Sequence, residues 1–95
     1  MKIFYTHQAI YDLKRLHQFI AKDSPKAAAA ASAKIRQAIE RLIDFPKLGR
    51  AVKNTEKSIS LRDVVTGKYV IRYILLKHEI HILRVWHGKE DKPAE

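Results

Sequence analysis

The segment DSPKAAAAASAKIRQAIERLIDFP, residues 23–46, constrains the fold more than any other part of the chain. Alanine has the highest intrinsic helix propensity, so the alanine run by itself predicts a helix. Ser24 is a good N-cap, and Pro25 suits the first helical position because its missing N–H would be unpaired there anyway. Pro46 ends the helix. An apolar stripe continues at helical spacing through Ala28, Ala31, Ile35, Ile39 and Leu42.

A second helix is predicted just upstream, from about His7 to Lys22. Its apolar residues recur at helical spacing, and we expect them to face the core: Ala9, Ile10, Leu13, Leu16, Phe19 and Ile20. Polar residues are expected on the opposite side of this helix: Asp12, Lys14, Arg15 and Gln18. Because only a few residues separate the two helices, they are expected to form an antiparallel hairpin.

The rest of the chain has the patterns of β-strands. The N-terminal MKIFYT is short and alternating, which predicts a first strand. A basic, turn-rich connection, FPKLGRAVKNTEK, leads to SISLRDV, in which Ile59 and Leu61 are expected to point inward. Two longer strands follow, GKYVIRYILL and EIHILRVWH, separated by a polar turn at 77–79. Both are apolar on two faces and therefore belong in the middle of a sheet.

The predicted fold is α+β, with the order β-α-α-β-β-β: an N-terminal strand, an antiparallel helical hairpin and a three-strand antiparallel meander. The chain has room for a single domain, residues 1–95, with about 89–95 as a loose C-terminal tail. It has no cysteine, which excludes disulfides and thiolate sites. The N-terminus turns polar too soon for a signal peptide and no run approaches membrane length, so we expect a cytoplasmic protein.

The charge of the chain is strongly positive. Lys and Arg number 19 against 10 Asp and Glu, a formal net charge of +9. Between Lys47 and Lys89 there are ten basic and three acidic residues, so the second half carries the excess. Such a field attracts nucleic acid, the ribosome or an acidic protein surface, although a solvated basic face is the simpler alternative.

No arrangement typical of catalysis or metal binding stands out in the sequence. The acidic residues are scattered singly, which argues against paired-carboxylate chemistry. The histidines His78, His81 and His87 are close in sequence, but His78 falls in a turn and the other two lie roughly 20 Å apart on an extended strand. The glycines are isolated and form no phosphate loop. We expect no metal site and no cofactor.

Basic residues gather on and around the last three predicted strands. If these strands pair as hairpins, several of the side chains converge on one edge or face of the sheet, where guanidinium groups bind phosphate or carboxylate in a bidentate manner. The residues are Arg62, Lys68, Arg72, Arg84 and Lys89, with His87 beside them. The alternative is that Arg72 and Arg84 form local salt bridges, for example to Asp63 or Glu79. Trp86 is expected in the core or at an interface.

Three segments resemble one known family. They are "IERLIDFPKLGR", which closes the second helix, "SLRDVVTGKYVIRYILL" and the terminal "ILRVWHGKED". In this order and spacing they resemble the RelE/ParE toxin superfamily of bacterial type II toxin–antitoxin systems, and specifically its ParE branch. The resemblance covers nearly the whole chain and implies the fold predicted above, together with a role as a toxin in systems of the plasmid-stabilisation kind.

The two branches differ in chemistry. RelE-type toxins cut messenger RNA on the ribosome, with two lysines on one strand, an arginine on the next strand and a late tyrosine. The lysine positions correspond to Ser58 and Ser60 here, the arginine position corresponds to Val70, and the chain ends KPAE without a tyrosine. The resemblance therefore implies no RelE-type catalytic residues. Two alternatives stay open: a ribosome-dependent endoribonuclease that uses His87 with Arg62, Arg84 and Lys89, and an inactive homologue that acts in autoregulation.

ParE-type toxins, by this resemblance, inhibit DNA gyrase by binding and are neutralised by a cognate antitoxin. We expect the antitoxin segment to be acidic and disordered, to lay a helix beside the helical hairpin and to add a strand at the sheet edge. Operator DNA is an expected further partner of the complex, contacted through the antitoxin. The residues expected to bind the target or the antitoxin are Arg62, Lys68, Arg84, Trp86, His87 and Lys89.

Overall fold

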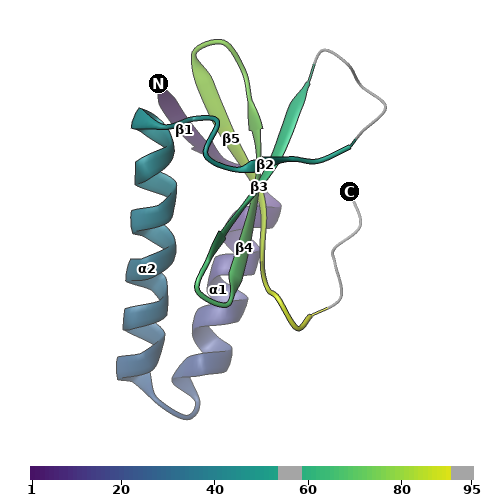
Figure 1. The fold of residues 1–95 in the computed structure, drawn as a ribbon. Coiled ribbons are helices and arrows are strands. Elements are labelled where there is room, and N and C mark those ends of the chain that lie inside the picture. Colours follow the sequence, from purple (N-terminus) through teal and green to yellow (C-terminus); the bar gives the residue numbers. More distant parts are fainter. Residues whose placement is uncertain (54–58, 91–95) are drawn as a thin grey trace.

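The computed structural model describes residues 1–53 and 59–90. Its elements follow one another in the predicted order, with one short strand in addition (Figure 1). They are β1 (Lys2–Tyr5), α1 (His7–Ala21), α2 (Pro25–Asp44), β2 (Arg50–Ala51), β3 (Ser60–Thr66), β4 (Tyr69–Leu75) and β5 (Glu79–His87). The strand β2 lies in the segment that the sequence predicted as a turn-rich connection, so that prediction was incomplete.

The described strands form one sheet in the order β1-β5-β4-β3-β2. The strands β3, β4 and β5 make the predicted antiparallel meander, and the two long strands lie in the middle of the sheet as expected. The first strand forms the other edge of the sheet. It pairs in parallel with β5, beginning with Lys2 opposite Glu79. The chain therefore joins its first strand to its last through a pairing that no local pattern specifies.

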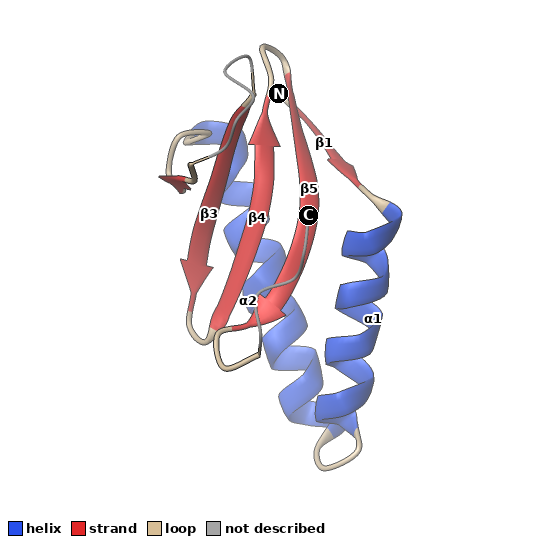
Figure 2. Ribbon diagram, turned by 90° about the vertical axis from the view of Figure 1, so that its right-hand side faces the viewer, coloured by secondary structure: helices blue, strands red, loops and turns tan. Residues whose placement is uncertain are grey.

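Both helices begin at the side chains that the sequence favours. The Ser24 hydroxyl accepts a hydrogen bond from the Ala27 N–H at 3.0 Å, and Pro25 is the first residue of α2. Thr6 caps α1 in the same way, since its hydroxyl accepts from the Ala9 N–H at 3.1 Å. The predicted helical hairpin is confirmed, with α1 along β5 and α2 behind the β3–β4 part of the sheet (Figure 2).

The core lies between this hairpin and one face of the sheet. Its fully buried members on the sheet include Ile71, Tyr73, Ile80, Ile82 and Val85, and α2 contributes Ile35, Ile39 and Leu42. Leu61 is buried as predicted, although outside this main cluster, and Ile59 is half-buried just before β3.

The predicted inward face of α1 is partly wrong. Ile10 and Phe19 were expected in the core but are 41% and 71% exposed, whereas Asp12 was expected on the polar side and is fully buried. Asp12 belongs to the buried face by its spacing from Ala9 and Leu16, which are three and four residues away. A buried carboxylate needs partners, and these come from β5.

A β-bulge shapes the part of β5 that receives this helix. Tyr73 pairs with Ile82 while Arg72 pairs with Arg84, so Leu83 is an extra residue on β5. A bulge of this kind increases the local twist and redirects the side chains next to it. The bulge begins where the pairing with β1 ends, since Ile82 is the last residue of β5 that pairs with β1.

Candidate functional site

Arg84 is held by an acidic residue from the other end of the chain. Its Nε donates to Asp12 Oδ2 at 2.8 Å and its Nη2 donates to Asp12 Oδ1 at 3.1 Å. The same carboxylate accepts the backbone N–H of Val85 at 2.9 Å. The local partners that the sequence suggested for Arg84, Asp63 or Glu79, are therefore wrong. Asp12 takes the place of a neighbouring strand on the part of β5 that β1 leaves uncovered.

The end of β5 continues this network into an ordered turn. Arg15 lies 3.7 Å from Asp12 and donates from Nη1 to Glu90 Oε2 at 2.6 Å. The other carboxylate oxygen of Glu90 accepts the His87 backbone N–H at 2.8 Å. Lys89 and Glu90, the first residues of the predicted loose tail, belong to this turn, and 91–95 lie outside the described residues.

Three of the predicted site residues meet at this turn. The Lys89 backbone N–H donates to Nδ1 of His87 at 3.0 Å, and Gly88 N–H donates to the Lys68 carbonyl at 2.7 Å. Because Nδ1 accepts, the neutral imidazole carries its proton on Nε2. The ring packs edge-on against Tyr69, with centroids 5.5 Å apart. Lys68 and Lys89 are exposed, so this corner combines two exposed basic residues with the His87 imidazole.

Arg72 and Trp86 form a second buried unit. Arg72 makes two hydrogen bonds to Asp63, from Nε to Oδ1 at 2.8 Å and from Nη2 to Oδ2 at 2.9 Å. Its guanidinium lies over the Trp86 ring, 5.2 Å from the centroid. The local pairing of Arg72 with Asp63 is confirmed, but both Arg72 and Trp86 are about 5% exposed or less, so Arg72 does not extend into solvent.

Arg62 lies apart from the other predicted residues and holds a loop. Its Nη1 donates to the Gly49 carbonyl at 2.7 Å and to the Lys47 carbonyl at 3.3 Å. The same loop is fixed by Tyr73, whose hydroxyl donates to the Pro46 carbonyl at 2.7 Å and accepts the Gly49 N–H at 2.9 Å. Burial raises the pKa of Tyr73 above its usual value, against a smaller opposite effect of the Gly49 hydrogen bond.

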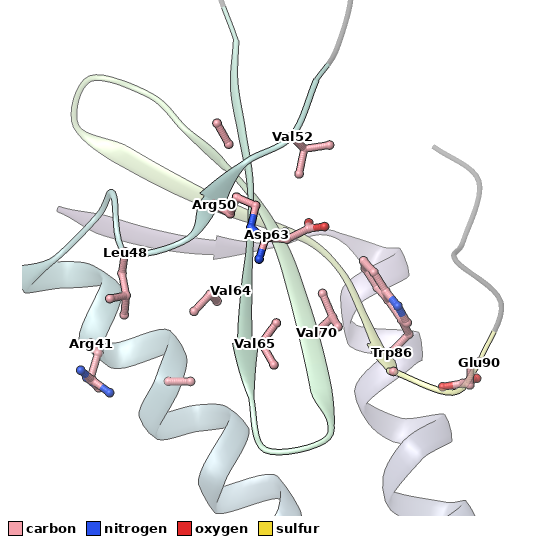
Figure 3. Close-up of a pocket in the computed structure, with 13 residues that line it drawn as sticks. Arg41, Leu48, Arg50, Val52, Asp63, Val64, Val65, Val70, Trp86 and Glu90 are labelled. Atoms are coloured by element: carbon pink, nitrogen blue, oxygen red, sulfur yellow. The ribbon is translucent and has the colours of Figure 1, made fainter.

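A cleft of about 930 Å³ surrounds the outer edge of β3 (Figure 3). It is lined by Ala38 and Arg41 from α2, by Leu48, Arg50, Ala51 and Val52, by Asp63, Val64, Val65, Val70 and Trp86 from the sheet, and by Gly88 and Glu90. Among the predicted site residues Trp86 alone belongs to this lining. The sequence offered no signal for the cleft, because the cleft lies where the short strand β2 no longer pairs with β3.

The positions that correspond to RelE catalytic residues are without charge. Val70, on β4, lines the cleft. Ser60, the first residue of β3, accepts a hydrogen bond from Arg62 Nε at 3.1 Å. Ser58 lies outside the described residues. Within residues 1–53 and 59–90 there is no group of three His, Cys, Asp or Glu that could hold a metal ion, and no helix is long and apolar enough to cross a membrane.

Comparison with known proteins decides the family. Residues 3–92 match the family model of the ParE toxin of the type II toxin–antitoxin system, parDE. The chain belongs to the ParE toxin family. It is thus a toxin of the ParE/RelE kind, and the resemblance seen in the sequence is confirmed.

Similar proteins are named as toxins, RelE toxins among them. Toxin RelE1 of Caulobacter vibrioides is 36% identical over 81 residues, which covers 85% of this chain and 86% of the relative. Putative toxin Y4kP of Sinorhizobium fredii is 32% identical over 94 residues, covering 97% and 93%.

Two solved structures share the fold. A structure of the chromosomal ParDE toxin–antitoxin system from P. aeruginosa has a TM-score of 0.70 at 18% identity and covers 94% of this chain and 97% of the other. The toxin–antitoxin complex RelBE2 from Mycobacterium tuberculosis has a TM-score of 0.62 at 22% identity, covering 90% and 95%. At these identities the likeness establishes the predicted α+β fold, and both branches share it.

Proposed function

We propose that this ParE-family toxin acts by binding and inhibits DNA gyrase. One observation supports binding over catalysis. The positions that would supply positive charge to a RelE-type reaction are either uncharged in this chain or already engaged in contacts within it. Cleavage at a scissile phosphate needs free positive charge and an acid or base around it. Ser60 and Val70 supply no charge, while Arg84 is engaged by Asp12 and Arg62 by two loop carbonyls.

The proposed partner is a cognate antitoxin with an acidic segment, in the cytoplasm where gyrase also acts. Two observations support this partner. Both fold neighbours come from toxin–antitoxin systems, and the net charge of +9 calls for an acidic counterpart. Operator DNA, contacted through the antitoxin, is the proposed further ligand of the complex.

The proposed binding residues remain Arg62, Lys68, Arg84, Trp86, His87 and Lys89. They divide into two groups by their environment. Lys68, His87 and Lys89 share one corner and are the members that a partner could reach directly. Arg62, Arg84 and Trp86 are held by intramolecular contacts, so their proposed contribution is to shape the surface around that corner.

A supercoiling assay tests the proposal. Purified toxin is added to gyrase and relaxed plasmid, and both supercoiling and trapped cleaved DNA are followed. We expect loss of supercoiling with accumulation of a cleavage complex, and restoration by the antitoxin. The Lys68→Glu/Lys89→Glu variant changes two of the proposed binding residues and should inhibit less than the parent toxin. Unchanged supercoiling at a large excess of toxin would refute gyrase as the target.

The alternative is ribosome-dependent RNA cleavage, and one observation favours it. His87 has Nε2 available as a proton donor while Lys89 fixes its Nδ1, and Lys68 belongs to the same corner. Relatives named RelE1 and RelE2 point the same way. Primer extension on transcripts after toxin induction decides the matter: codon-internal cuts that disappear in His87→Ala would establish the ribonuclease.

The size of the His87→Ala effect also separates the two mechanisms. Loss of a general acid or base costs about 10²–10⁴-fold in rate, whereas loss of one contact at the rim of an interface weakens binding by a much smaller factor. If expression of the parent toxin caused no growth arrest at all, the remaining option would be an inactive homologue that serves in autoregulation.

A further inference from the structure

A further basic residue lies at the corner of Lys68, His87 and Lys89. This residue is Lys34 on α2, which lies against the β3–β4 turn, since a Cβ at Gly67 would be 3.7 Å from Lys34 Cδ and 3.8 Å from its Nζ. Gly67 has a φ of 57°, which glycine adopts without strain. Three segments that are far apart in the sequence therefore bring Lys34, Lys68 and Lys89 to one end of the sheet. These three residues are called the lysine corner below.

The backbone of the lysine corner is fixed by hydrogen bonds. The Gly88 N–H donates to the Lys68 carbonyl at 2.7 Å, which joins the β3–β4 turn directly to the turn after β5. In that second turn the Lys89 N–H donates to His87 Nδ1 at 3.0 Å. The attachment points of Lys68 and Lys89 are thus set relative to each other, while each ammonium group stays on a flexible four-carbon stem.

The lysine corner offers positive charge without a free carboxylate beside it. Glu90, the acidic residue of the turn after β5, is engaged by Arg15 at 2.6 Å and by the His87 N–H at 2.8 Å. The three lysines are exposed. Within residues 1–53 and 59–90, none of their side chains takes part in an ion pair or a hydrogen bond.

The surroundings of the lysine corner favour a phosphate backbone over a protein or single-stranded RNA. In the described part of the chain, none of the large exposed apolar side chains belongs to residues 66–69 or 87–90. Tyr69 is half-buried against His87, Trp86 is buried, and the exposed Val65 lines the cleft. Protein interfaces depend on buried apolar anchors, and the bases of single-stranded RNA stack on exposed aromatic rings. Lysines without such anchors suit phosphates, which they contact whatever the base sequence.

We propose that Lys34, Lys68 and Lys89 bind the phosphodiester backbone of duplex DNA. The setting of this contact rests on the proposed function, because the duplex is the one that gyrase holds. The inference adds that the toxin touches the nucleic acid as well as the enzyme. Duplex DNA suits such a cluster because it carries one negative charge per roughly 1.7 Å of its axis, so that several phosphates lie within reach of neighbouring lysines.

The salt dependence of DNA binding provides the first test. The full-length toxin is titrated into a short, fluorescently labelled duplex without gyrase, and anisotropy is measured from low to moderate salt. Each neutralised phosphate contributes about −0.9 to the slope of log affinity against log salt, so three contacts predict a slope of about −2.7. Lys34→Gln/Lys68→Gln/Lys89→Gln should remove most of this slope and weaken binding at low salt at least tenfold.

A matched control removes the same charge at the opposite end of the sheet. Lys2→Gln/Lys47→Gln/Lys77→Gln also replaces exposed lysines. Lys77 follows β4, whose seven residues separate it from Lys68 by roughly 20 Å, and Figure 2 shows the two turns at opposite ends of the sheet. The control should keep the slope and lose less than threefold in affinity. An equal loss in both variants would show attraction by net charge alone and would overturn the proposed site.

Competition against the labelled duplex tests the class of ligand. Unlabelled duplex DNA should displace the probe at a charge concentration at least threefold lower than single-stranded RNA and at least tenfold lower than polyglutamate. Displacement by RNA at an equal or lower concentration would replace DNA by RNA as the ligand. The same result with polyglutamate would assign the lysine corner to an acidic protein.

The outcomes distinguish this inference from the function that gives it its setting. If the parent toxin inhibits gyrase but the lysine-corner variant binds the duplex as well as the parent does, the DNA contact is refuted while gyrase remains the target. If gyrase is unaffected by a large excess of toxin, and the predicted slope appears and is lost in the variant, the proposed target fails while the DNA contact at the lysine corner stands.

Discussion

Asp12 on α1 and Arg84 on β5 form a two-point ion pair, with the nearer contact at 2.8 Å, in which the carboxylate is fully buried and also accepts the Val85 N–H. The Asp12 side chain thereby accepts hydrogen bonds both from a guanidinium and from a buried backbone N–H on the strand edge that β1 leaves uncovered. The pair joins residues 72 positions apart and holds the helical hairpin against the last strand. Arg84, which looks from the sequence like a free cation for a ligand, has a large part of its hydrogen bonding committed to the fold.

Removal of Asp12 should therefore destabilise the protein strongly. Asp12→Ala leaves the Arg84 guanidinium and the Val85 N–H without their acceptor, and breaking a buried pair in this way costs about 3–5 kcal/mol. Urea unfolding followed by circular dichroism measures the change. Asp23→Ala, at an exposed aspartate just after α1, is the control and should change stability by less than about 0.5 kcal/mol. Equal stabilities of the two variants would show that the pair contributes nothing.

The buried hydroxyl of Tyr73 predicts a loss of stability in alkali. Burial raises its pKa above 10.0, so the folded state keeps the proton at pH values where the unfolded chain has lost it. Protons bound in the folded state then exceed those bound in the unfolded state, and the free energy of unfolding falls as pH rises beyond 10. Unfolding curves from pH 8 to 11 should show this decline.

Tyr73→Phe separates the hydroxyl from the ring. The variant should lose about 1–3 kcal/mol at neutral pH, because the Gly49 N–H and the Pro46 carbonyl lose a partner. Its stability should also decline less steeply above pH 10 than that of the parent. Tyr69→Phe, for which no hydroxyl hydrogen bond is described, is the matched control. If Tyr73→Phe kept the full alkaline decline, another group would be responsible.

Gly49 has no room for a side chain. A Cβ at this position would lie 2.8 Å from both Cε1 and the hydroxyl oxygen of Tyr73, and 3.0 Å from the Asp63 carbonyl. Gly49→Ala should therefore destabilise the fold by about 1–3 kcal/mol, the usual cost of overpacking. Gly88→Ala places its Cβ 3.4 Å from the Lys68 carbonyl and should cost less than Gly49→Ala. Thermal unfolding of both variants tests the order, which must hold if the loop is held as described.

Ionic strength should act on association of the antitoxin more than on its release. A net charge of +9 attracts an acidic partner from a distance. Salt at 0.1 M largely screens this attraction beyond a Debye length of about 10 Å. Stopped-flow measurements between low and high salt should show a strong decrease in the on-rate and only a modest change in the off-rate. If the off-rate carried the whole effect, or the complex dissociated at moderate salt, buried apolar contacts would not supply the main affinity.

The sequence predicted well those features that depend on neighbours along the chain. The start of α2 at Ser24 and Pro25 and its end before Pro46 follow from capping and proline chemistry. The central place of β4 and β5 follows from apolar residues on both of their faces. Each of these features depends on residues within one or two turns, or within one strand.

The contacts that span the chain could not be predicted in this way. Asp12 has the spacing of a buried residue relative to Ala9 and Leu16, but its charge predicted an exposed position. Nothing in the neighbouring sequence indicates that Arg84 lies opposite its carboxylate. The strand β2 is too short to give a periodic signal. The basic residues were grouped by charge alone, and the sequence could not show that Arg62 is directed to loop carbonyls.

The parallel pairing of β1 with β5 has a consequence for how the toxin comes into being. A ribosome makes Lys2–Tyr5 early, but these residues have no strand partner until Glu79–Ile82 have been synthesised. Asp12 likewise waits for Arg84. The helical hairpin can form from local interactions during translation, whereas the sheet that buries its apolar side cannot close. A nascent chain that ends before Glu79 therefore cannot form the complete sheet, so the folded toxin appears only after β5 has been synthesised.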